Sequence, residues 1–375
     1  MAIAGITAAT PDPPGGRIER QADGEPSGIL RERAVELVER YIPEPDLNDV
    51  KHAVQRGCAL LHRLGLTGVH APDPLRYLEA YQELAEAGEM GLRVLAMVPL
   101  AELAEAAAHG WRTGVGNELV RIGPVKILAD GALGSQSALM FAPYEGSTDN
   151  YGIGVVWGKE LADAIHRSLS AGFSVAVHAI GDKANHEVLN LLAAAAAESR
   201  RRKFRPRLEH AQLLQPADIP RFGALGVVAS VQPLHCPSDR YMADQYWGGR
   251  CRGAYAFASL LAGGAVLAFG SDAPVEDPDP RLGIHAAVTR QRADEPDSQP
   301  WYGHECLPVV AALYAYTMGP AIAAGEADIK GSLTPGKLAD ITVFAEDLTV
   351  IPPKDIPEVP VAATLIGGRF MYRAF

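Results

Sequence analysis

Short apolar runs alternate with amphipathic segments along most of the chain. Amphipathic segments at residues 51–65, 74–88, 158–172, 182–203 and 216–226 predict helices, and seven apolar runs at residues 65–71, 92–100, 120–130, 173–181, 205–212, 226–233 and 265–273 predict strands. Strands that are apolar on both faces and separated by helices are typical of a parallel sheet built from βα units. The strands often follow one another at intervals of about 30 residues, as in an eight-stranded TIM barrel. The pattern therefore predicts an α/β fold of the (β/α)8 barrel type in which seven strands are identified.

The two ends of the chain differ from this middle part. Roughly the first 46 residues are rich in Pro and Gly and contain one helical pattern, at residues 28–42. From residue 331 the chain turns to short alternating runs separated by Gly and Pro, which predicts a small β element. We therefore expect two domains, an incomplete barrel over 1–330 and a small β part over 331–375. An open barrel exposes two strand edges, which natural proteins tend to cover, and a homodimer could do so.

Composition and charge narrow the class of protein. Among 375 residues, 48% are hydrophobic and 21% are charged, which is ordinary for a soluble globular protein. The net charge of −11 argues against a nucleic-acid partner, and the basic run 200–207 is interpreted as a solvated helix end and loop. The start of the chain does not resemble a secretory signal, no long apolar run suggests a membrane span, and the four cysteines are scattered. We expect a cytoplasmic protein.

Candidate chemistry lies where the predicted strands end. Lys126, His178, His210 and Asp272 are polar residues at or near the ends of otherwise apolar strands. Reactive groups of TIM barrels lie at the carboxyl ends of the strands, and burying a polar group without a partner costs several kcal/mol. A metal ion is one partner that could serve all four. Taken singly, each also has an ordinary interpretation: a surface lysine, a hydrogen-bonded core histidine, or an aspartate that caps a helix.

Six stretches in order along the chain carry a family resemblance. They are VKILADGALGSQSALMFAPYEG, VAVHAIGDKANHEVL, RLEHAQLLQPADIPRF, ASVQPLHCPSD, FGSDAPVEDPDPRLGIHAAVTR and GSLTPGKLADITVF. Together they resemble the family 3 branch of the amidohydrolase superfamily, which includes N-substituted formamide deformylases. The likeness begins near residue 5 and continues through nearly the whole chain. It implies a TIM barrel with a small β-sandwich, so residues 331–375 are expected to be a part of that sandwich.

The resemblance implies roles for the four strand-end residues. Lys126 matches a lysine that becomes carboxylated and bridges two divalent metals. His178 and His210 match histidines that hold one of those metals. Asp272 matches an aspartate that binds metal and carries a proton from the attacking water to the leaving amine. These roles agree with the chemistry, because neutral imidazole suits zinc and bound water becomes acidic on the metal.

Two further residues and one missing motif complete the comparison with the family. His235 resembles a residue that faces the substrate. Asp182, four residues after His178, could form hydrogen bonds to the metal ligands and so orient them, although helix capping is an equally good interpretation. The family's first strand ends in His-x-His, whereas none of the eleven histidines here has another two residues away. We therefore expect an N-terminally truncated chain that binds one metal ion, most simply zinc, rather than two.

The resemblance implies a metal-dependent hydrolase of a non-peptide C–N bond in a small amide, formamide or cyclic amide. Two other readings stay open. The chain could be a catalytically impaired remnant or a non-catalytic binding protein on the same barrel. It could also keep the metal and catalyse an isomerisation or a decarboxylation, because fold alone does not fix the reaction.

Overall fold

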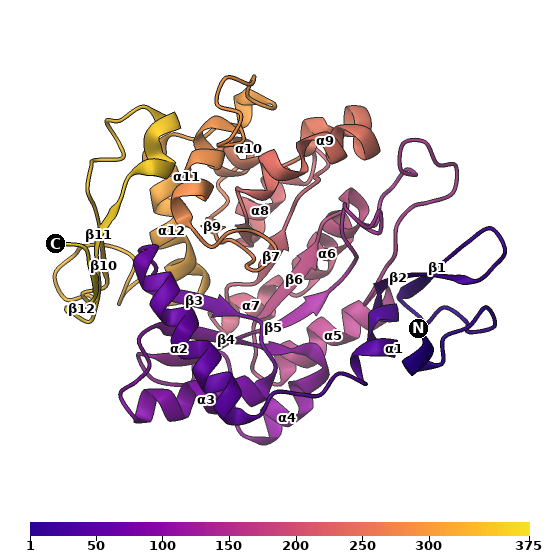
Figure 1. Cartoon of the computed structure of the whole chain (residues 1–375), viewed down its shortest axis with the longest axis horizontal. Helices are drawn as coiled ribbons and strands as arrows, with labels where there is room; N and C mark the ends of the chain where they lie inside the picture. The colour runs from indigo at the N-terminus through magenta and orange to yellow at the C-terminus, as the bar shows by residue number, and fades with distance from the viewer.

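The computed structural model describes residues 1–375, and a curled parallel sheet of seven strands lies at its centre (Figure 1). The strands are neighbours in chain order: β3 (Gly68–Ala71), β4 (Arg93–Pro99), β5 (Val120–Leu128), β6 (Val175–Ala179), β7 (Arg207–His210), β8 (Val228–Val231) and β9 (Leu267–Phe269). All seven predicted strands are confirmed, each somewhat shorter than its apolar run. The two edge strands, β3 and β9, each pair with one neighbour, so the sheet forms an open, barrel-like α/β fold.

Helices alternate with the strands along the chain. They are α2 (Leu47–Arg63), α3 (Leu75–Glu86), α4 (Leu103–Ala108), α5 (Lys159–Ser170), α6 (Asp182–Ala194), α7 (Ala196–Arg201), α8 (Ile219–Leu225), α9 (His235–Trp247), α10 (Phe257–Ala262), α11 (Pro280–Thr289) and α12 (Val309–Ala323). The five predicted helices are confirmed, except that the one predicted over 182–203 is divided into α6 and α7. No helix combines the length and the apolar character that crossing a lipid bilayer requires.

Alternation along the strands decides which side chains face the inside of the curl. In β5, Val125 and Ile127 are fully buried in the main hydrophobic core, and Lys126 between them points to the opposite face. In β6, Val177 belongs to the same core, whereas the next residue, His178, faces inward. The apolar residues thus fix the polar ones on the concave face.

The N-terminal segment corrects one prediction. Residues 28–42 do not form one helix: β2 (Pro26–Glu32) is followed by the 3-10 helix η2 (Arg33–Val35) and by one helical turn, α1 (Glu36–Glu39). β2 pairs with β1 (Gly16–Arg20) as an antiparallel hairpin in which Ile18 faces Leu30. Gly28 has a φ of 101°, which no helix accommodates. Cross-strand pairing has therefore overridden the helical pattern.

The C-terminal residues form a small antiparallel sheet against the barrel, at the opposite side of the molecule from the N-terminal hairpin (Figure 1). Its strands are β10 (Ile341–Phe344), β11 (Val361–Ile366) and β12 (Arg369–Arg373), as the alternating runs predict. The Thr364 hydroxyl donates to the carbonyl of His62 at the end of α2, over 2.7 Å. Asp340 accepts two bonds from buried Arg93 of β4, at 2.5 and 2.8 Å. The division into two domains at residue 330 stays a prediction.

Five short 3-10 helices complete the chain: η1 (Ala2–Ala4), η3 (Leu100–Glu102), η4 (Gly248–Gly253), η5 (Gly303–Glu305) and η6 (Pro353–Glu358).

Candidate metal centre

Three neighbouring strands bring Lys126, His178 and His210 to one edge of the sheet. Lys126 lies on β5, His178 on β6, and His210 is the last residue of β7. In the parallel register, His178 is the partner of Leu128, and His210 is the partner of Ala179. All three therefore lie toward the carboxyl ends of the strands, where barrel enzymes carry their reactive groups.

Asp272 and His235 reach the same place from the segments that follow β9 and β8. One possible ligand atom from each of His210, His235 and Asp272 lies within 4.8 Å of the other two. Nε2 of His235 is 3.9 Å from Oδ2 of Asp272. The ring of His178 stands edge-on to that of His210, with centroids 4.6 Å apart. The structure thus brings together His210, His235 and Asp272, with His178 beside His210, although these residues are far apart in the sequence.

Burial keeps the three imidazole rings neutral at neutral pH. Burial, followed by the charge of Lys126, lowers the pKa of His178 to about 4. Burial also lowers the pKa of His235 to about 4. The pKa of His210 is lowered by burial first and then by His178, Lys126 and His235. A neutral ring retains the lone pair that a metal ligand requires.

The pKa values of Lys126 and Asp272 are shifted in directions that suit the chemistry expected of these residues. Burial lowers the pKa of Lys126, although Glu209 and Asp272 act in the opposite direction. A lower pKa enlarges the fraction of neutral amine, which is the form that reacts with carbon dioxide. Burial raises the pKa of Asp272, with Lys126 opposing the shift. A carboxylate with a raised pKa is a better proton acceptor.

The backbone is strained at two of these residues. His210 and Asp272 have φ values of 74° and 59°, and Ala211 follows with 43°. Residues other than glycine rarely adopt this region, and each costs about 1–3 kcal/mol. Such strain clusters at functional sites, so its presence beside both side chains supports a functional role for this edge of the sheet.

The sequence profile of the amidohydrolase family matches residues 1–372. The chain belongs to the amidohydrolase family. It is 33% identical to the putative amidohydrolase YtcJ of Bacillus subtilis and 35% identical to the protein LONG AFTER FAR-RED 3 of Arabidopsis thaliana. It is 26% identical to the N-substituted formamide deformylase of Arthrobacter pascens. Each match covers 99% of this chain, and respectively 70%, 66% and 70% of the relative. The chain therefore spans about two thirds of the length of these proteins.

A solved structure agrees with this assignment. The fold matches an uncharacterised metal-dependent hydrolase from Pyrococcus horikoshii with a TM-score of 0.78 and 29% sequence identity. The match covers 90% of this amidohydrolase and 68% of the other chain.

The donor set of this amidohydrolase fits a divalent cation. Neutral imidazoles and a carboxylate are the nitrogen and oxygen ligands that zinc and neighbouring first-row ions accept. Nε2 of His235 is buried with no hydrogen-bond partner, whereas Nε2 of His178 lies 3.2 Å from the carbonyl oxygen of Gly131 and 3.5 Å from Oδ1 of Asp130. A buried polar atom without a partner, such as Nε2 of His235, is normally satisfied by water or by another group bound at the site.

The sequence does not reveal a buried ion pair beneath the site, because residue 207 ends a basic run that predicts a solvated helix end and loop. Arg207 is instead 1% exposed on β7, and its Nε lies 2.9 Å from Oε1 of buried Glu209. Its Nη1 donates to Nδ1 of His70 over 2.7 Å. Alternation around Leu208, which packs in the outer core, places both charged residues on the concave face. The same alternation in RLEH was the available signal.

Two buried glutamines at the site could not be identified from the sequence either. Gln232 follows the end of β8 and contacts His210, and Gln212 lies two residues beyond β7 and contacts His235. Nothing local in the sequence separates them from ordinary polar loop residues, because each contact joins segments more than twenty residues apart.

The two aspartates near His178, Asp130 and Asp182, accept hydrogen bonds from loop residues and so hold these loops in place. Asp130 accepts hydrogen bonds from the backbone N–H groups of Leu139, Ile180 and Gly181, at 2.8, 3.0 and 2.9 Å, and lies 3.5 Å from Nε2 of His178. Asp182 was the residue expected to orient ligands from behind. Its carboxylate accepts from the Phe141 N–H and the Gln215 side chain, so any effect of Asp182 on His178 would pass through these loops.

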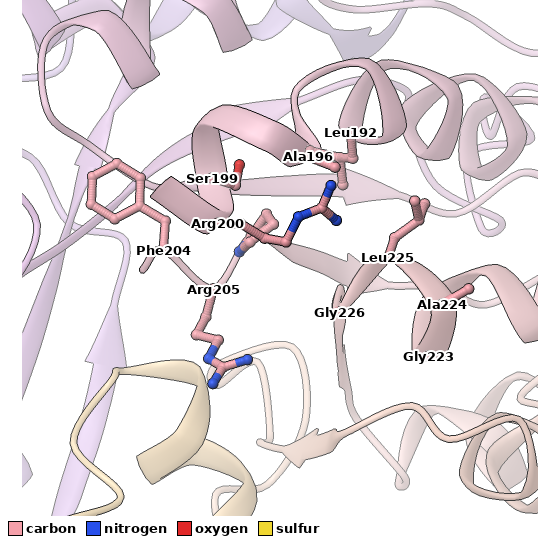
Figure 2. Close-up of a pocket in the computed structure, with 11 residues that line it drawn as sticks. Leu192, Ala196, Ser199, Arg200, Phe204, Arg205, Gly223, Ala224, Leu225 and Gly226 are labelled. Atoms are coloured by element: carbon pink, nitrogen blue, oxygen red, sulfur yellow. The ribbon is translucent and has the colours of Figure 1, made fainter. Parts of the chain in front are cut away.

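A pocket of about 250 Å³ lies at the other end of the sheet (Figure 2). It is lined by residues that precede β7 and β8, among them Arg205, Pro206 and Gly226, together with Ser199 and Arg200 at the end of α7. The candidate metal ligands lie at the opposite, carboxyl ends of the strands. The pocket is therefore distinct from the candidate metal centre of this amidohydrolase.

Proposed function

We propose that this amidohydrolase uses a divalent metal ion, expected to be zinc, to hydrolyse a non-peptide C–N bond in a small amide, formamide or cyclic amide. The observation that carries the proposal is the convergence of neutral histidines, a lysine and a carboxylate at the carboxyl ends of the strands. The identity to a deformylase of N-substituted formamides supports an amide-type substrate.

His178, His210 and Asp272 would hold the ion, together with a carbamate formed on the amine of Lys126. One ion is the expected occupancy, because the chain contains no His-x-His pair for a second. When bound, the ion supplies Lewis acidity, which polarises the substrate carbonyl and makes a water molecule more acidic.

Asp272 is the proposed general base and acid. Its carboxylate accepts a proton from the attacking water as the new C–O bond forms, and delivers that proton to the nitrogen as the C–N bond breaks. The raised pKa of Asp272 suits both transfers, since the group must accept and then release a proton near neutral pH. His235, 3.9 Å from Asp272, would contact the substrate.

The test combines metal analysis with turnover. The chain purified and reloaded with zinc should contain about one equivalent and hydrolyse members of a panel of N-formyl and N-acyl amines. Reaction in H₂¹⁸O should place ¹⁸O in the carboxylate product, which an isomerisation or a decarboxylation would not do. Asp272→Asn should abolish turnover, whereas Asp297→Asn, a matched change at an exposed residue, should leave it intact.

Two results would contradict the proposal. Zinc content far below one equivalent would remove the metal site. Full zinc content without hydrolysis of any amide in the panel would favour the alternative, a binding protein on the same fold.

A further inference from the structure

Two buried histidines at the metal centre each meet a glutamine side chain, and the two contacts have opposite polarity. Nδ1 of His210 lies 2.8 Å from the carbonyl oxygen, Oε1, of Gln232. Nδ1 of His235 lies 3.1 Å from the amide nitrogen, Nε2, of Gln212. All four side chains belong to residues that are less than one-tenth exposed. Solvent therefore does not compete freely for these bonds.

Each contact selects one tautomer of a neutral ring. An amide oxygen only accepts, so His210 must carry its proton on Nδ1, which leaves the lone pair of Nε2 free. An amide nitrogen only donates, so Nδ1 of His235 must be the acceptor, and its proton must be on Nε2. The first ring can then bind a cation through Nε2, whereas the second presents an N–H group at the same position.

The surroundings of His235 favour the same tautomer independently of the glutamine. Its Nε2 is buried, has no hydrogen-bond partner and lies 3.9 Å from Oδ2 of Asp272. A proton on the buried Nε2 faces that carboxylate favourably, whereas a lone pair there would face the negative charge of Asp272, although the carboxylate itself is 38% exposed. The amide of Gln212 must then turn its NH₂ group toward Nδ1.

We propose that Gln232 and Gln212 are positioning residues that set opposite tautomers, making His210 a metal ligand and His235 a hydrogen-bond donor. Distance alone groups His210, His235 and Asp272 as possible ligands. The tautomers separate them, since His235 offers no lone pair toward the cation. The donor of His235 is left for Asp272 or for the oxygen of a substrate. This inference rests on the proposed function in one respect, namely that the species bound by His210 is a divalent metal ion.

The direct test is ¹⁵N NMR of the histidine rings in the metal-free wild-type protein at neutral pH. Long-range ¹H–¹⁵N correlations, assigned with His210→Asn and His235→Asn, distinguish the protonated nitrogen of each ring. The expected result is a proton on Nδ1 of His210 and on Nε2 of His235. The same tautomer in both rings, or the reverse pair, would overturn the proposal, whatever reaction the protein catalyses.

A matched pair of variants tests the consequence for the metal. Gln232→Met should weaken zinc affinity by roughly 10–100-fold, as the loss of a residue that orients a ligand commonly does. Gln212→Met should leave zinc affinity unchanged and lower kcat rather than raise KM. Equal losses of zinc affinity in the two variants would make His235 a ligand and refute the assignment. The NMR measurement needs no metal, and the zinc titration needs no turnover. A failure of the proposed hydrolase activity would therefore be distinguishable from a failure of the tautomer assignment.

Discussion

Replacing Glu209 by Gln should destabilise the protein strongly, although the two side chains have nearly the same shape. Glu209 lies on β7 inside the curled sheet, and its partner Arg207 is 1% exposed. The other contacts of the guanidinium are neutral: Nδ1 of His70 at 2.7 Å and the sulfur of Met97 at 3.0 Å. The substitution would leave a buried cation without a countercharge.

The size of the effect follows from the distance. Two unit charges 2.9 Å apart attract by about 6 kcal/mol at an effective dielectric constant of about 20. Part of this is offset, because the mutant no longer has to bury the carboxylate. Burial alone would raise the pKa of Glu209, but Arg207 and Lys126, with a hydrogen bond from Ser230, hold it below its usual range. Breaking such a pair by removing one partner costs about 3–5 kcal/mol.

Urea unfolding of the metal-free protein, followed by circular dichroism, would measure this loss in the free energy of unfolding. The double variant Arg207→Met/Glu209→Gln should recover a large part of it, since neither charge is then buried alone. Glu198→Gln makes the same chemical change in a solvent-accessible ion pair with Arg201 and Arg202 and should lower the free energy of unfolding far less than Glu209→Gln does. A Glu209→Gln protein as stable as wild type would refute the reasoning.

Three other outcomes are expected. Asp340→Ala should lower the free energy of unfolding by about 3–5 kcal/mol in the same urea assay, because Arg93, 6% exposed, loses its bidentate partner. A loss below about 1 kcal/mol would mean that this ion pair does not stabilise the packing of the C-terminal sheet against β4. The folded-state pKa of His178, about 4, lies below its ordinary 6.5, so the unfolded chain binds the proton more tightly. His178 should therefore contribute about 3 kcal/mol above pH 6.5 that is lost as the pH falls through 4, and a metal-free His178→Gln protein that loses stability as steeply as wild type over this range would contradict the assignment. Protein loaded with zinc in ¹³C-bicarbonate should show one carbamate carbon signal that disappears in Lys126→Met; a signal that survives would place the carbamate elsewhere.

The sequence was sufficient to predict the repeating strands and helices, because apolar runs and amphipathic segments are local signals. It was insufficient where contacts between segments far apart in the sequence determine the local structure or the burial of a residue. The pattern at 28–42 favours a helix, but pairing of Leu30 with Ile18 makes a hairpin. Charge counting placed Arg207 on the surface, although its position in an alternating strand puts it inside.

The candidate site divides in the same way. Lys126, His178 and His210 stand at strand ends that periodicity locates, so their meeting at one edge could be predicted from the fold. The partners of the histidine rings could not, because each glutamine contact joins segments at the ends of different strands and depends on which end of an amide faces the ring.

The most direct measurement is anomalous diffraction at the zinc edge from crystals of the zinc-loaded protein. We expect one strong peak about 2.0–2.2 Å from ring nitrogens of His178 and His210 and from the Asp272 carboxylate, with a carbamate on Lys126 completing the set. A peak bound by His235 in place of His178, or no peak at the carboxyl ends of the strands, would contradict the proposed metal centre.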